Sequence, residues 1–278
     1  MDIGYLKFIR PKAPQLQALI KGYYVHTATE ADFFAKITFY QNITTTISIY
    51  RDSVVSSEGR LRRQHHQKGK GFLSLLVGLV DKYQDVEFHG PLDRLAIVFY
   101  PTGINHFIRS PLSNFLKRHY SVFHYFDPYF EDFLPKVYEE PVLENKRDML
   151  DAFFLDHYQE LGESKLLKAV ESLVYGEDPA KVDELAQQLN LSRRTLLRKF
   201  KKHLGYSLEE YISVIKFRRA LYTFQNQQDN VQLTNIAYTS NYYDQPDFNR
   251  QIKSRSGLTP KELFAAMAII DDTLFWKL

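Results

Sequence analysis

Cysteine is absent from this 278-residue chain, which excludes disulfides, thiolate nucleophiles and metal sites with cysteine ligands. A chain without thiols is compatible with a reducing compartment. Long apolar runs are absent too, since no stretch reaches the roughly 18 residues that a membrane-spanning helix needs. Residues Met1 to Tyr5 lack the basic and apolar regions of a signal peptide. These absences predict a cytoplasmic protein that does not enter a membrane.

The histidines do not form the pattern that a metal enzyme needs. A cupin-type metal site takes several histidines and a carboxylate that converge on one cavity. The chain contains no His-x-His pair, and the neighbours His65 and His66 would point to opposite faces of a strand. His26 and His89 stand alone, and a lone histidine is more often structural than a ligand. The sequence therefore predicts no metal, no cofactor and no catalysis, with a cupin-type metal-dependent enzyme as the alternative.

Charge is distributed unevenly along the chain, whose net charge is only +3 with histidine neutral. Residues 1–164 hold 19 basic and 20 acidic side chains, whereas residues 165–278 hold 17 basic and 13 acidic ones. Within the second part, residues 192–219 carry nine basic side chains and two acidic ones. By itself such a run is typical of a solvated face. Its meaning depends on the pattern around it.

The apolar pattern divides the chain into a β-rich first part and a helical remainder. Short runs of β-branched and aromatic residues between turn residues predict strands at 22–27, 35–40, 44–51, 70–78 and 92–100. Helical spacing begins at Asn105, and an amphipathic stretch follows from Glu144 to Leu161. Everything after Ser164, which is placed to cap a helix, is predicted to be helical. We therefore expect two domains, 1–163 and 164–278.

Two features of the first part are candidates for a site. The aromatic side chains from Phe123 to Phe133 are predicted to pack helices or a dimer, and lining a ligand pocket is the alternative. The basic stretch from Arg60 to Lys68 is predicted to be a solvated loop, and contact with an anion or DNA is the alternative.

A short helical unit occurs twice in the second part. Leu185-Ala186 recurs as Ile236-Ala237, 51 positions later. Five further residues recur 52 positions later: Leu196, Arg198, Phe200, Lys201 and Gly205 correspond to Phe248, Arg250, Ile252, Lys253 and Gly257. Self-similarity at a fixed spacing indicates a repeated supersecondary unit.

Each copy is predicted to be a helix, a tight turn and a second helix. In the first copy the turn lies at Asn190-Leu191, where asparagine tolerates the left-handed conformation, and Ser192 caps the next helix. In the second copy the turn lies at Asn241-Tyr242 and Asp244 is the cap. Pro246 is compatible because it falls in the first helical turn, where its missing N–H is not needed.

The two copies are joined by a predicted helix that ends near Phe224. It opens with the spacing of a capping box, in which Ser207 and Glu210 each bond the other's backbone N–H.

The second helix of each copy has the composition of a DNA recognition helix. In the first copy a buried stripe of Leu196, Phe200 and Leu204 leaves a basic face. Such a helix fits the major groove, where arginine bonds guanine in two places and glutamine or asparagine bonds adenine. The candidate DNA-binding residues are Arg193, Arg194, Leu197, Arg198, Lys201 and Lys202 in the first copy and Gln245, Asn249, Arg250 and Lys253 in the second. For Arg250, a salt bridge within the domain is the alternative.

At these residues the sequence resembles the AraC/XylS family of bacterial transcriptional regulators. Residues 192–201 followed by Gly205 are similar to the first recognition helix of the family. Residues 248–253 and the terminal Gly257-Leu258-Thr259-Pro260 are similar to the second. The resemblance covers about residues 165–267. The chain departs from the family pattern at Asn241-Tyr242, where Gly-Phe is usual, and at Ile252, where Phe is usual.

The resemblance implies an α+β protein with a β-rich, cupin-like barrel and following helices in residues 1–163. This domain would act as a sensor or in dimerisation, and residues 164–278 would form an all-α domain with two helix-turn-helix units. The implied function is transcriptional regulation, with two recognition helices that read successive major grooves of double-stranded DNA. RNA polymerase, a small-molecule effector and a second copy of the chain are further implied partners. The operator, the effector and the choice between activation and repression stay open.

A third alternative is an adaptor protein that uses the basic helices to bind another protein. It accounts for the charge and leaves the duplicated unit unexplained.

Overall fold

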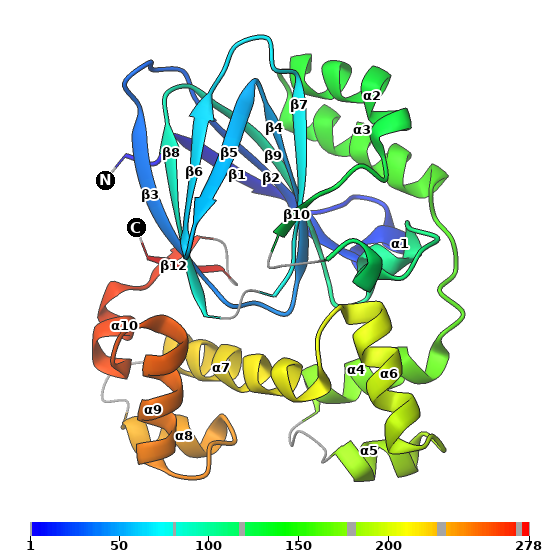
Figure 1. Ribbon diagram of the computed structural model, residues 1–278, viewed down its shortest axis with the longest axis vertical. Coiled ribbons are helices and arrows are strands. Elements are labelled where there is room, and N and C mark those ends of the chain that lie inside the picture. The colour runs from blue at the N-terminus through cyan, green and yellow to red at the C-terminus, as the bar shows by residue number, and fades with distance from the viewer. Residues whose placement is uncertain are drawn as a thin grey trace.

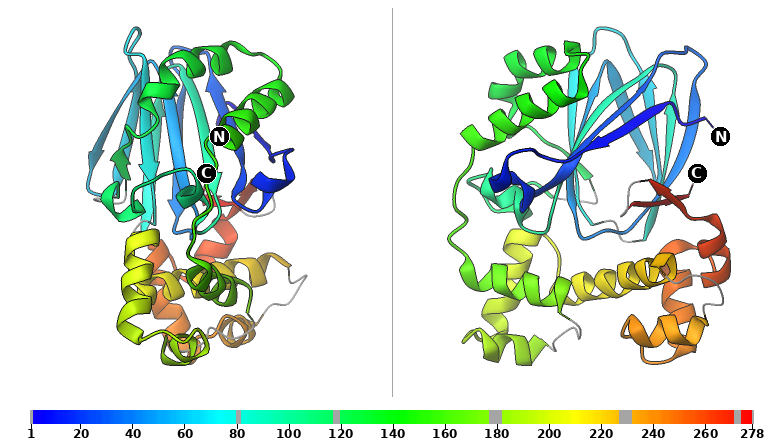
Figure 2. Two further views of the ribbon diagram at one scale, coloured as in Figure 1. Left: turned by 90° about the vertical axis from the view of Figure 1, so that its right-hand side faces the viewer. Right: turned by 180° about the vertical axis from the view of Figure 1, so that it is seen from behind.

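The computed structural model describes residues 2–79, 82–116, 120–176, 182–226, 232–270 and 274–277. Figure 1 shows two sheets with a pair of helices beside them, above a row of helices. The two ends of the chain lie near each other beside the sheets (Figures 1 and 2).

Two six-stranded sheets form the β-rich part. In the first, sheet A, neighbouring strands are antiparallel in the order β1 (Tyr5–Ile9), β2 (Ile20–Ala28), β9 (Leu92–Phe99), β4 (Thr45–Arg51), β7 (Phe72–Val77) and β10 (Tyr120–Val122). In the second, sheet B, the order is β11 (Ala268–Ile270), β12 (Leu274–Lys277), β3 (Phe34–Tyr40), β8 (Tyr83–His89), β6 (Leu61–His66) and β5 (Ser53–Glu58). The pair β6 and β8 is parallel.

The predicted barrel is corrected to two facing sheets, because the described strands do not join into a closed barrel. The sheets share an interior, in which the His26 ring of sheet A lies 5.1 Å from the Phe88 ring of sheet B. The prediction of an all-α second domain is also wrong. The segment after residue 267 forms β11 and β12, and β12 pairs with β3 of the first part.

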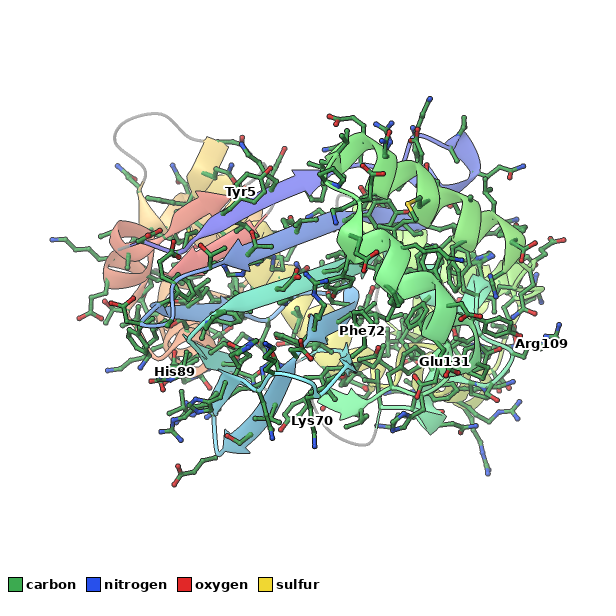
Figure 3. All side chains as sticks on the ribbon, turned by 90° about the horizontal axis from the view of Figure 1, so that it is seen from above. Tyr5, Lys70, Phe72, His89, Arg109 and Glu131 are labelled. Atoms are coloured by element: carbon green, nitrogen blue, oxygen red, sulfur yellow. The ribbon has the colours of Figure 1, made fainter. Side chains whose placement is uncertain are left out.

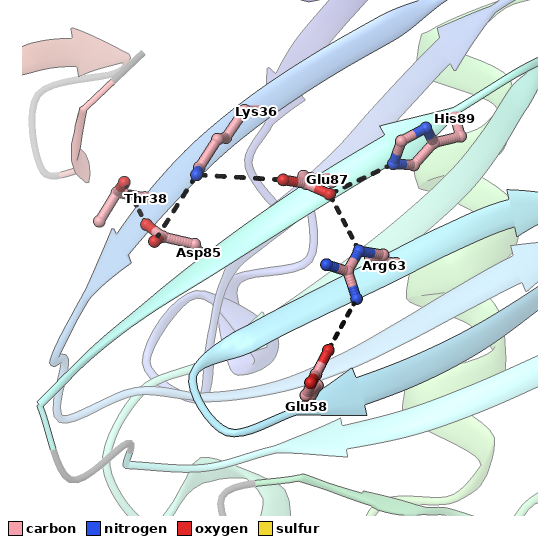
Figure 4. A network of polar contacts seen from close by, with 7 residues as sticks. All are labelled: Lys36, Thr38, Glu58, Arg63, Asp85, Glu87 and His89. Carbon is pink, nitrogen blue, oxygen red and sulfur yellow. Dashed lines mark hydrogen bonds and ion pairs between the residues drawn. The ribbon is translucent and has the colours of Figure 1, made fainter.

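Five strands lie where the sequence predicts them, namely β2, β3, β4, β7 and β9. The prediction of a solvated basic loop over residues 60–68 is wrong, because residues 61–66 form β6. Successive side chains of a strand point to opposite faces. Arg62 therefore faces the interior of the sandwich and is buried, whereas Arg63 lies on the outer face of sheet B. There it pairs with Glu58 at 3.3 Å and with Glu87 at 3.2 Å (Figure 4).

The helices of the first part are α1 (Pro14–Gln17), the 3-10 turns η1 (Gly103–His106) and η2 (Leu112–Asn114), α2 (Asp127–Glu139) and α3 (Leu143–Asp156). The segment directly after Asn105, where the sequence shows helical spacing, forms only the two short turns η1 and η2. Pro111 separates them, because proline has no backbone N–H to donate. Helices α2 and α3 lie beside sheet A (Figure 3). The aromatic stretch packs these helices, since Phe126 and Phe130 share a core with Tyr23 of β2. The prediction of helix packing is therefore confirmed, and dimer packing stays a prediction.

The helices of the second part are α4 (Ser164–Tyr175), α5 (Val182–Gln188), α6 (Arg193–Leu204), α7 (Leu208–Asn226), α8 (Leu233–Thr239), α9 (Gln245–Ser256) and α10 (Pro260–Ala266). Ser164 does not cap α4, because it is the first helical residue and Glu163 holds the capping position. The Glu163 carboxylate contacts Lys199 and lies 3.4 Å from His203 of α6. The domain boundary at residue 163 stays a prediction. Among the described helices, none is long and apolar enough to cross a membrane.

The β-rich part contacts both halves of the helical part. The Asn105 side chain donates a 2.9 Å hydrogen bond to the carbonyl oxygen of His203, at the end of α6. At the end of α9, the Arg255 guanidinium donates to Gln41 of the β-rich part and to Ser213 of α7. Tyr40 of β3 packs against Phe217 of α7, with ring centroids 6.4 Å apart. Helix α7 thus runs directly beneath the open end of the sheets (Figure 1).

His26 predicts how acid affects the first part. Its Nε2 donates a 2.6 Å hydrogen bond to the carbonyl oxygen of Ile3, and burial, helped by the charge of Arg94, lowers the pKa of His26 to about 4. The unfolded chain takes up this proton near pH 6.5, so the contribution of His26 to stability is present above that pH and lost as the pH falls toward 4. We expect the free energy of unfolding to fall there by up to about 1.4 kcal/mol per pH unit from this group.

Urea unfolding at a series of pH values measures this slope. His26→Gln should reduce the slope. His66→Gln, which alters an exposed histidine that holds no ion pair with a described residue, serves as the control and should leave the slope unchanged. An unchanged slope in His26→Gln contradicts the assignment.

Candidate nucleic-acid interface

The repeated apolar residues are the cores of two helix-turn-helix units. In the first unit Leu185, Ala186, Leu196 and Phe200 pack with the first half of α7. In the second, their counterparts pack with the second half of α7, which contributes Phe217 and Leu221; the counterparts are Ile236, Ala237, Phe248 and Ile252. Helix α7 therefore belongs to both cores and fixes one unit relative to the other. Ile252 is fully buried like Phe200, so this departure from the family pattern leaves the core intact.

The turns and caps have the local geometry that the sequence predicts. Asn190 and Asn241 adopt the left-handed conformation, with φ of 50° and 60°. The Ser192 hydroxyl accepts a 3.2 Å hydrogen bond from the backbone N–H of Thr195. The Asp244 carboxylate accepts one of 2.7 Å from Asp247. The capping box of α7 is present as well.

Helix α6 presents a basic face to solvent. Exposed on it are Arg193, Arg194, Arg198, Lys201 and Lys202, while Leu197 is half-buried. Arg193 is held by Asp183, 3.1 Å away. Within the described residues, no ion pair involves Arg194, Arg198, Lys201 or Lys202. The basic face of α6 therefore offers guanidinium and ammonium groups that do not have to leave an acidic partner before they bind a ligand.

Helix α9 presents a more polar and less basic face. Arg250 is 73% exposed and pairs with Asp247 at 2.5 Å, so the alternative of a salt bridge within the domain is observed. Gln245 accepts a 2.8 Å hydrogen bond from the hydroxyl of Thr234. The Oδ1 atom of the half-buried Asn249 is itself buried and has no hydrogen-bond partner among the described residues, and Lys253 is exposed. Arg250 has to leave or share Asp247 before it contacts another group, which Arg198 does not.

The basic run of residues 192–219 divides into two sets, which the sequence did not separate. Arg219 donates to the side chain of Asn241 at 3.1 Å and to the carbonyl oxygen of Leu173 at 3.2 Å, so it ties the turn of the second unit to the end of α4. Lys199 is paired with Glu163, and Arg218 points toward the β-rich part. The other lysines and arginines of α6 make up the exposed set.

The two recognition helices run in the same sense relative to the sheets. The end of α6 at Gly205 lies against Leu116, and the end of α9 at Gly257 lies against the Tyr83 ring. Both glycines adopt positive φ, and a Cβ at Gly257 would fall 2.8 Å from the Tyr83 ring. The starts of α6 and α9 therefore point away from the sheets, at the two ends of α7 (Figure 1). Arg194 and Arg198 lie in this outer half of α6, and Gln245 and Asn249 in that of α9.

No candidate metal centre accompanies this interface in the described part of the chain. There, no group of three or more His, Asp or Glu side chains lies close enough together to hold a metal ion.

Two protein families match the chain. A helix-turn-helix domain matches residues 185–266, and a domain of unknown function, DUF6597, matches residues 8–121. The Msm operon regulatory protein of Streptococcus mutans is 25% identical over 118 residues, which are 41% of this chain and 42% of that protein. The HTH-type transcriptional activator RhaS of Mannheimia succiniciproducens is 30% identical over 81 residues, 29% of this chain and 30% of that protein. The chain thus matches less than half the length of each of these relatives.

Among solved structures, ToxT from Vibrio cholerae with a bound unsaturated fatty acid has a TM-score of 0.44 and 13% sequence identity. That likeness covers 87% of this chain and 94% of the ToxT chain.

Proposed function

We propose that this chain is a sequence-specific regulator that binds double-stranded DNA. The proposal follows from its membership of the AraC/XylS family of helix-turn-helix transcriptional regulators. One observation carries this proposal: two recognition helices, α6 and α9, stand at the two ends of α7 with their outer halves turned away from the sheets. Two helices held in this way suit two successive major grooves, about one helical turn apart.

The two helices divide the task unequally. Helix α6 has three arginines and two lysines exposed, so it supplies most of the attraction to phosphate and the strongest contact to guanine, through Arg198. Helix α9 supplies Gln245 and Asn249, whose amides match an adenine edge once the Gln245 oxygen leaves the Thr234 hydroxyl and the buried Asn249 oxygen turns outward. The site is therefore expected to be asymmetric, with one groove read by arginine and the next by amides.

The alternatives explain fewer of these features. An adaptor that binds an acidic protein has use for the basic face of α6 and none for a second unit with buried cores at the same repeat positions. A metal-dependent enzyme needs a cluster of ligands, and the similar proteins with known roles are regulators. We assign the first part to effector sensing or dimerisation, and contact with RNA polymerase to the surface outside α6 and α9.

Selection from a random duplex pool with the full-length protein tests the proposed function. The selected site is expected to show two protected patches about one helical turn apart in a hydroxyl-radical footprint. Lys7→Ala, which removes one exposed charge from the first part, is the control and should leave the footprint unchanged. Failure to enrich any sequence, or uniform binding to all duplexes at every salt concentration, contradicts the proposal.

A further inference from the structure

Two buried arginines face each other across the interior of the sandwich. Arg62 of β6 and Arg94 of β9 are 5% and 7% exposed, and both line one cavity of about 100 Å³. Each guanidinium lies over a tyrosine ring, that of Arg62 at 5.3 Å from Tyr120 and that of Arg94 at 5.7 Å from Tyr50. The rings fix the planes of the guanidinium groups and leave their N–H edges for other partners.

Those N–H edges are not satisfied by the described residues. The Nε and Nη1 groups of Arg62 and the Nε of Arg94 are buried without a hydrogen-bond acceptor. The Nη2 group of Arg94 donates a 2.9 Å hydrogen bond to the Ser48 hydroxyl. The hydroxyl of Tyr40, which also lines the cavity, is buried and unpartnered too. Among the described residues that line the cavity, none is an aspartate or a glutamate.

The neighbouring residue Arg63 provides a comparison, because its charge is balanced by acidic side chains. On the outer face of sheet B, Arg63 is paired with two glutamates (Figure 4). Arg62, one position earlier, is buried and has no acidic partner among the described residues. A buried charge without a partner is strongly unfavourable, and burial together with the nearby charge of Arg94 lowers the pKa of Arg62. Such an arrangement costs stability unless an anion completes it.

We propose that Arg62 and Arg94 form a binding site for the carboxylate of a small organic acid. A carboxylate is planar and accepts two parallel N–H bonds from a guanidinium edge, so one group can engage both arginines. Apart from the Asn42 amide and the Arg218 guanidinium, the remaining lining is apolar or carries hydroxyls, as in Tyr24, Val98 and Thr46. Such a lining suits a short uncharged body beside the carboxylate. The volume of the cavity limits the ligand to a small acid.

The same cavity is also lined by α7, through Arg218. Burial lowers the pKa of Arg218 to about 9, so this side chain remains charged at neutral pH. An acid bound between the sheets therefore lies next to the helix that belongs to the cores of both recognition units. If the proposed function holds, binding of the acid and binding of DNA are coupled, and each changes the affinity for the other by the same factor.

Thermal unfolding and calorimetry of the full-length protein without DNA test the site by itself. The probes are acetate, butyrate and benzoate, each compared with its neutral amide and with equal concentrations of chloride and inorganic phosphate. At least one of these carboxylates is expected to raise the melting temperature above all of its comparison solutes. A rise with phosphate as large as with every carboxylate, or no rise with any carboxylate, overturns the proposal.

Variants of the neighbouring arginines provide the matched comparison. Arg62→Leu is expected to weaken binding of the responding carboxylate roughly ten- to hundredfold and to raise the melting temperature in chloride alone, because it removes an unpaired buried charge. Arg62→Lys, which keeps the charge and lacks the planar fork, should bind weakly. Arg63→Leu should bind like the wild type. Equal carboxylate binding by Arg62→Leu and wild type overturns the proposal.

DNA titrations with and without the carboxylate separate the two proposals. Carboxylate binding without any DNA binding leaves the arginine site in place and contradicts the regulatory function. Specific DNA binding without carboxylate binding supports the regulatory function and contradicts the arginine site.

Discussion

Arg198→Ala is expected to reduce the affinity for the selected DNA site and, by nearly the same factor, the preference for that site over a scrambled duplex. An arginine that bonds a guanine edge in two places contributes about 1–3 kcal/mol of discrimination, or roughly 5- to 150-fold. Arg198 is exposed in the outer half of α6 and, within the described residues, holds no acidic partner. Arg198→Ala should therefore lose the whole free energy of the contact with guanine, because the arginine does not first have to leave an acidic side chain.

Lys201→Ala separates base contacts from phosphate contacts on the same helix. Lys201 lies nearer the end of α6, and we expect it to meet the DNA backbone. Its removal should weaken binding about equally on both duplexes and lower the slope of affinity against salt by about one unit. The measurement is a titration of wild type, Arg198→Ala and Lys201→Ala over a salt series. If Arg198→Ala leaves the ratio of specific to scrambled affinity unchanged, Arg198 does not read a base.

The helix-turn-helix units were predictable from the sequence because their determinants are local. The turn at Asn190, the cap at Ser192 and the capping box at Ser207 each involve residues within four positions of one another, and all take the predicted geometry. The repeat also predicted the core residues, because the positions that are apolar in both copies are buried in both.

The role of Arg219 was not predictable in this way. Its partners Leu173 and Asn241 are 46 and 22 positions away, so sequence alone placed it only in the basic run of residues 192–219. The same holds for β6, whose strand partner β8 supplies the reason that Arg62 is turned inward.

One feature of the sequence itself points to the arginine cavity. Between Leu92 and Phe99 the chain is apolar except at Asp93 and Arg94, and alternation puts Arg94 on the same face as Ala96 and Val98. A charged residue on the apolar face of a strand needs a partner or a ligand.

The barrel prediction was wrong because sequence periodicity within a strand shows which side chains point inward and does not show whether the edge strands pair with each other.

Phe248→Ala is expected to disrupt the second helix-turn-helix unit and leave the first one folded. The Phe248 side chain is fully buried, with its ring 5.2 Å from that of Tyr242, and it packs in the core that includes Phe217 and Leu221 of α7. Removing a buried phenylalanine side chain costs about 3–5 kcal/mol, a large share of the roughly 5–15 kcal/mol that holds a typical domain together. The first unit has its own core around Phe200, to which Phe248 does not belong.

A footprint on the selected site distinguishes the two units. Phe248→Ala should lose the protected patch that α9 makes and keep the one from α6, about one helical turn away. Phe200→Ala, the matched change in the first unit, should lose the other patch and, because α6 carries most of the exposed basic side chains, should weaken binding more. Circular dichroism of both variants, compared with wild type, checks that the sheets remain folded. If both variants lose both patches, α7 makes the two units one cooperative body, and the division of the site between two independent readers is wrong.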